Sequence, residues 1–135
     1  MAKITEDYVS SETAKLLKEK GFDHSCEYQY INCSSGHPFL TDIRDDAGCY
    51  YKNSEIGEDE YSAPTLQMVM KYLRKKHKLC IVSMPVVTDD DGDGGCLWNF
   101  VISRKLKPLY ESEHLYESPE TAFNDAIKYC LENLI

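Results

Sequence analysis

The sequence predicts an α+β fold, in which three helices pack an antiparallel sheet of three to five strands that includes a hairpin of residues 79–87 and 96–103. Two apolar runs bracket the acidic, glycine-rich segment 88–95, which is typical of a hairpin. Apolar residues also recur at helical spacing near residues 66–77 and 119–134. With 135 residues, of which 42% are apolar, the chain is expected to form a single domain, 1–135.

A first helix is predicted to run from about Ser10 to Lys20. Ser10 is placed to cap its first turn, and Gly21 can take the left-handed conformation that ends a helix, with Phe22 following it. Because the apolar face of this helix is short, it needs a sheet or a partner on which to dock.

The segment 26–53 predicts a small meander of strands. Apolar and polar residues alternate from Cys26, and residues 39–43 and 49–51 are short candidate strands. The run 53–60 that follows is polar and acidic, which is typical of a solvated connector.

Two further helices have clear start and stop signals. Pro64 lies near the first turn of one, and Ser118 followed by Pro119 begins the other. The first ends in the cations of residues 74–78, where the helix dipole favours positive charge. The apolar stripe of the last helix contains Phe123, Ala126, Ile127, Cys130, Leu131 and Leu134.

Both strands of the predicted hairpin are apolar on both faces, so they require cover on two sides. Pro85 cannot donate to a ladder, which makes its strand an edge or a site of a bulge. Three short helices would most easily cover one face, and Leu97 and Val101 lie on the other. We therefore expect the chain to form a two-fold homodimer or to bind a protein partner through this hairpin. In the alternative, the first helix and the meander of 26–53 cover the second face and the chain is a monomer.

Charge and cysteine content limit the function further. A net charge of −8 and a pI near 4.9 argue against a general nucleic-acid binder. Six cysteines without an apolar signal segment at the start predict a cytoplasmic protein with reduced thiols. Cys80, Cys96 and Cys130 fall in apolar patterns, which predicts that they are buried. No apolar run reaches the ~20 residues that span a bilayer, so no membrane role is expected.

Two groups of residues carry the spacing of metal ligands. Asp89, Asp91 and Asp93 match the start of a calcium loop, but its twelfth position is Phe100 where a glutamate is required. A hairpin turn explains the same residues. The second group is His24, Cys26, Cys33 and His37.

The second group has a six-residue gap between its cysteines, which departs from the short knuckles of zinc sites. Neither group is therefore expected to bind metal. No phosphate-binding loop, dinucleotide fingerprint or hydrolase motif occurs, so no cofactor and no catalytic residue is predicted.

Segments 13–22, 62–74 and 126–134 resemble a family of short proteins from Bacteroides-type gut bacteria, often associated with phage or mobile elements. The family has no assigned activity, so the resemblance implies an accessory protein and supplies no residue roles. We expect a cytoplasmic accessory or interaction protein without catalysis. The alternatives are a small enzyme with an unmarked active site and an acidic inhibitor that imitates DNA.

Overall fold

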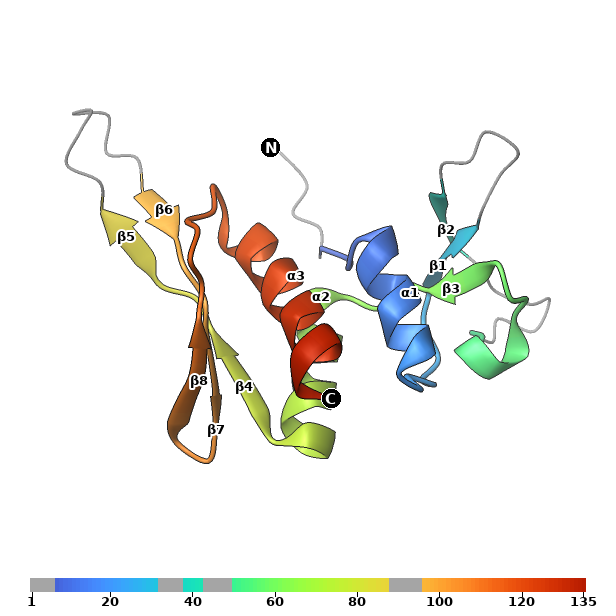
Figure 1. The fold of residues 1–135 in the computed structure, drawn as a ribbon. Coiled ribbons are helices and arrows are strands. Elements are labelled where there is room, and N and C mark those ends of the chain that lie inside the picture. Colours follow the sequence, from blue (N-terminus) through green and yellow to red (C-terminus); the bar gives the residue numbers. More distant parts are fainter. Residues whose placement is uncertain (1–6, 32–37, 43–49, 88–95) are drawn as a thin grey trace. The chain divides into compact units, whose positions relative to one another are not determined.

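The computed structural model describes residues 7–31, 38–42, 50–87 and 96–135. They form two compact units, Met1–Thr65 and Leu66–Ile135, which are described separately below (Figure 1). Each unit contains helix and antiparallel sheet, so the predicted α+β class is confirmed. The strands are divided among small sheets of two or three strands. The expectation of a single domain stays a prediction.

The first helix of unit 1, α1 (Ser11–Glu19), begins and ends at the predicted signals. The Ser10 side chain accepts a hydrogen bond from the backbone N–H of Thr13, at 3.3 Å. Gly21 has a φ of +87°, and the N–H of Phe22 donates to the carbonyl of Leu17 at 2.9 Å. This is the Schellman arrangement, in which a left-handed glycine lets the chain satisfy the last carbonyls of a helix.

The sheet of unit 1 has the order β2-β1-β3, with β1 (Tyr28–Ile31) between β2 (Phe39–Asp42) and β3 (Glu60–Ser62). Both pairings are antiparallel, as the predicted meander requires. A short 3-10 turn, η1 (Asn53–Glu55), precedes β3. Of the predicted strand 49–51, Cys49 lies outside the described residues, and Tyr51 forms only an isolated bridge with Cys26.

Unit 2 begins with α2 (Leu66–Tyr72), which continues as the π-helical turn η2 (Leu73–His77). Lys78 ends the helix in a left-handed conformation, with a φ of +60°. The apolar residues at helical spacing in 66–77, which are Leu66, Val69, Met70 and Leu73, are buried. His77, on the same stripe, is half-buried. The last helix, α3 (Pro119–Tyr129), is capped by Ser118 as predicted and continues as η3 (Cys130–Leu134).

The predicted hairpin is present as four short strands that share one register. They are β4 (Leu79–Val82), β5 (Pro85–Val87), β6 (Cys96–Trp98) and β7 (Val101–Arg104). Leu79 lies opposite Arg104, and Val87 lies opposite Cys96 at the other end. A last strand, β8 (Lys107–Glu111), pairs with β7 on the side away from β4. The two long strands of the prediction are therefore correct, with an interruption in the middle of each.

Asn99 causes that interruption. The backbone N–H of Met84 donates to the side-chain Oδ1 of Asn99 at 3.0 Å, where a ladder would use a backbone carbonyl. The backbone carbonyl of Asn99 accepts instead from the Ser83 hydroxyl at 2.6 Å. Since backbone groups alternate in direction along an antiparallel strand, Pro85, next to Met84, turns its missing N–H away from β6. The predicted edge position of Pro85 is thus explained.

Candidate functional site

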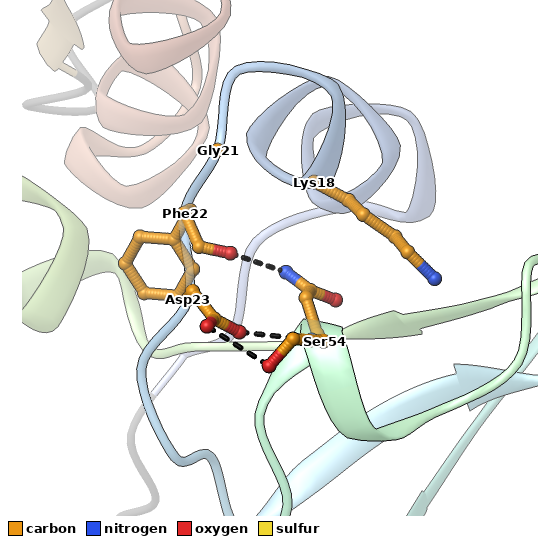
Figure 2. A pocket seen from close by; sticks show the side chains of 6 residues that line it. Lys18, Gly21, Phe22, Asp23 and Ser54 are labelled. Carbon is orange, nitrogen blue, oxygen red and sulfur yellow. Dashed lines mark hydrogen bonds between the residues drawn. The ribbon is translucent and has the colours of Figure 1, made fainter.

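Unit 1 contains a hollow of about 340 Å³ between the end of α1 and η1 (Figure 2). It is lined by Lys18, Gly21, Phe22, Asp23, Asn53 and Ser54. A concave site with an amine, a carboxylate and an amide is where an unmarked enzyme would be sought first. What these groups can do depends on whether they are available to a ligand.

Asn53, one of the residues that line the hollow, joins two backbone segments. Its Nδ2 donates to the carbonyl of Phe22 and its Oδ1 accepts from the N–H of Ser62, both at 2.8 Å. The side chain is only 5% exposed. The prediction that residues 53–60 are a solvated connector is therefore wrong at Asn53, because this amide supplies hydrogen bonds that two buried backbone groups require.

The two charged groups at the hollow are also bound to the protein. The Asp23 carboxylate accepts from the N–H and the hydroxyl of Ser54, at 2.8 and 2.9 Å (Figure 2). These bonds lower the pKa of the Asp23 carboxyl. The Lys18 ammonium donates to the carbonyls of Gly57 and Glu60, at 2.6 and 2.8 Å. The polar side chains that line the hollow are thus bonded to their own chain and stabilise the fold.

The proposed zinc ligands are only partly within the described residues. His24 is exposed and Cys26 is buried, whereas Cys33 and His37 lie outside that part of the chain. Burial raises the pKa of the Cys26 thiol to about 11, which disfavours the thiolate that zinc binds. Asp89, Asp91 and Asp93 also lie outside. Within the described ranges, no three His, Cys, Asp or Glu side chains gather as metal ligands.

The predicted burial of cysteines is correct for Cys130 and wrong for Cys80 and Cys96. Cys130 is fully buried, and burial raises the pKa of its thiol to about 12. Cys80 and Cys96 are exposed. For Cys80 the reason is that a strand has two faces, and Cys80 points away from the helices. Cys96 lies opposite Val87, on the face of Leu79 and Ile102, and alternation does not account for its exposure.

One face of the unit 2 sheet, here called the inner face, packs against the last helix. Leu79 and Ile102 on this face are fully buried. The ring of Tyr110 stacks on Tyr129 at a centroid distance of 3.8 Å, and Arg104 donates to the carbonyl of Leu134 at 3.4 Å. In Figure 1, α2 and α3 lie on the same side of these strands. The inner face is therefore the core of unit 2.

The opposite face, here called the outer face, is apolar and largely uncovered. By strand alternation it contains Cys80, Val82, Met84, Val86, Leu97 and Val101, together with the polar Ser103 and, on β8, Glu111. Val82 and Met84 are each 51% exposed. Leu97 and Val101, the two residues that the sequence placed on the second face, are half-buried. Aliphatic side chains in a continuous exposed row are characteristic of a contact surface.

Cations gather at one end of this sheet. Pairing of Leu79 with Arg104 brings the end of η2 beside the β7–β8 turn, both at the lower end of unit 2 in Figure 1. This cationic end contains Arg74, Lys75, Lys76, Lys78, Arg104, Lys105 and Lys107. Lys105 and Leu106 both have positive φ values, and Leu106 is 100% exposed. Glycine or asparagine would suit this turn better.

The sequence prediction found the cations of residues 74–78 and missed those of the β7–β8 turn. One signal was available: the chain has 23 acidic residues, yet none falls in 61–88 or 94–110. Acidic groups resume with Glu111, which lies opposite Val101, and Glu117, which follows Tyr116. Tyr116 bridges Trp98 and its ring lies against Phe100, so alternation places Glu117 on the outer side.

Comparison of the chain with protein-family models, curated proteins and solved structures finds no match. In the described part of the chain, the helices are too short or too polar to cross a membrane. The candidate sites are therefore interpreted from their own geometry. Unit 1 has a hollow whose polar side chains are bonded to their own chain, and unit 2 has an apolar outer face.

Proposed function

We propose that this chain is a cytoplasmic interaction protein without catalysis, which binds another protein surface through the outer face of unit 2. The observation that carries the proposal is the exposure of Val82 and Met84, in a row of apolar side chains on the face opposite the buried Leu79, Phe100 and Ile102. Burying such side chains stabilises a complex by about 25 cal/mol for each Å² removed from water. The four cysteines in the described part of the chain are free thiols, two of them exposed, which suits a reducing compartment.

The two alternative functions receive less support from the same surfaces. An unmarked enzyme requires polar groups that are available to a substrate, whereas Lys18, Asp23 and Asn53 are bonded to their own chain. An inhibitor that imitates DNA requires a continuous acidic surface. Unit 2 instead presents a cationic end that contains seven of the chain's 15 lysines and arginines.

In-cell photo-crosslinking tests the proposed function directly. Val82 would be replaced by p-benzoylphenylalanine, and the chain would be expressed in its native host and irradiated. We expect a covalent adduct of defined mass, because the outer face is in contact with protein. The matched control carries the same photoreactive residue at Lys15, which is exposed on α1.

Adducts at position 82 without adducts at position 15 would support a specific contact surface. No adduct at position 82, or equal labelling at both positions, would overturn the proposal. The mass of the adduct separates a second copy of the chain from a different protein, and either result is compatible with the proposed function.

A further inference from the structure

We infer that the partner of the outer face is a second copy of this chain, related by a two-fold axis that runs across the strands. This inference rests on the proposed function and adds the identity and the orientation of the partner. Two features support it: the outer face is apolar, and the two ends of that face differ in charge.

Two sheets that pack face to face keep their strands within about 30° of alignment. A two-fold axis between identical outer faces must therefore lie nearly along the strands or nearly across them. An axis along the strands places the cationic end of one copy against the cationic end of the other. An axis across the strands places the cationic end of one copy against the opposite end of the other copy's outer face. The two orientations of the dimer therefore differ in their charge contacts.

Among the described residues, the far end of the outer face carries one acidic side chain, Glu117. Lys105 lies at the β7–β8 turn, beyond Arg104, whereas Glu117 lies beside the strand that contains Leu97 and Trp98. Both side chains are exposed. With the axis across the strands near Val82 and Val101, Lys105 of each copy approaches Glu117 of the other. Each dimer then contains two such contacts between opposite charges.

The size of the face sets the expected strength. Two strands of nine residues are about 30 Å long and roughly 10 Å wide across their pair, so about 300 Å² of each copy is covered, which is less than standard specific interfaces bury. We therefore expect a weak, transient dimer. Because apolar burial alone is modest, the charge contacts decide which orientation forms.

Charge exchange between the two ends tests the inference. Sedimentation velocity of the full chain would compare wild type with Lys105→Glu, Glu117→Lys and the double variant at low salt. In the crossed arrangement each single change creates two like-charge contacts, and we expect dimerisation to weaken about ten-fold. The double variant exchanges the charges and should restore wild-type affinity.

Controls keep the result specific to the outer face. Lys15→Glu and Glu19→Lys on α1 make the same changes in net charge and should leave dimerisation unchanged. Val82→Lys should abolish it, and circular dichroism confirms that each variant is folded.

Three results would overturn the inference: a wild-type chain that stays monomeric at 1 mM, a double variant as weak as the single ones, or equal weakening by the α1 controls. If the chain is monomeric while position 82 crosslinks to a different protein in cells, the inference fails and the proposed function stands.

Discussion

The two units of the chain are stabilised by different means. In unit 1, side chains repeatedly satisfy backbone groups: Asn53 joins two segments, and Lys18 binds two carbonyls. In unit 2, burial of aliphatic and aromatic groups between the inner face and α3 is the main contact. Polar side chains in unit 1 therefore stabilise the fold and do not indicate a binding site. In unit 2, the apolar residues that the core does not bury form the candidate interface.

The largest expected effect comes from the core of unit 2. Ile102→Ala removes a fully buried side chain and should destabilise the fold by about 3 kcal/mol, through lost apolar burial and a residual cavity. Val82→Ala, on the opposite face at 51% exposure, should cost less than about 1 kcal/mol. Urea unfolding of both variants measures the difference. Equal destabilisation would show that the outer face is covered within the chain.

A slightly smaller effect is expected from the polar joint of unit 1. Asn53→Ala leaves the carbonyl of Phe22 and the N–H of Ser62 without their partners, which should cost roughly 2 kcal/mol. Ser54→Ala, at the exposed neighbour, removes one hydroxyl bond to Asp23 and should cost under about 1 kcal/mol. Hydrogen exchange at Ser62 provides the local readout. A stable Asn53→Ala variant with a protected Ser62 amide would contradict the role given to this amide.

The smallest expected effect is the loss of folding stability at high pH that is caused by one buried thiol in each unit. Burial raises the pKa of Cys26 to about 11 and that of Cys130 to about 12, from an ordinary value of 9.0. Since both pKa values are higher in the folded state, the stabilisation is complete below about pH 9. It is lost as pH rises toward 11–12, because the unfolded chain loses these protons first. At pH 10 we expect a loss of about 1 kcal/mol for each thiol.

Urea unfolding at pH 8 and pH 10 measures this loss, and Cys26→Ala and Cys130→Ala assign it to each unit. Each variant should show a smaller decrease between the two pH values than wild type does. Rapid alkylation of Cys26 or Cys130 in the folded protein at pH 8, at the rate of exposed Cys80, would contradict their burial.

Local signals in the sequence determined most of the secondary structure. Ser10 and Ser118 predicted helix starts, and Gly21 predicted a helix end, because capping depends on residues only a few positions apart. The extent of the two hairpin strands followed from their apolar runs, and the edge position of Pro85 followed from its missing N–H. These features involve neighbours in the chain, so the sequence carries them in full.

Only the tertiary structure decided which side of each element is covered. Alternation predicts that Cys80 and Leu79 point in opposite directions, but the packing of α3 on one face buried Leu79 and left Cys80 exposed. The role of Asn53 depends on Phe22, which is far away in the sequence. The cationic end forms because the pairing of Leu79 with Arg104 brings η2 beside the β7–β8 turn. Such contacts depend on the path of the whole chain, which short-range patterns do not contain.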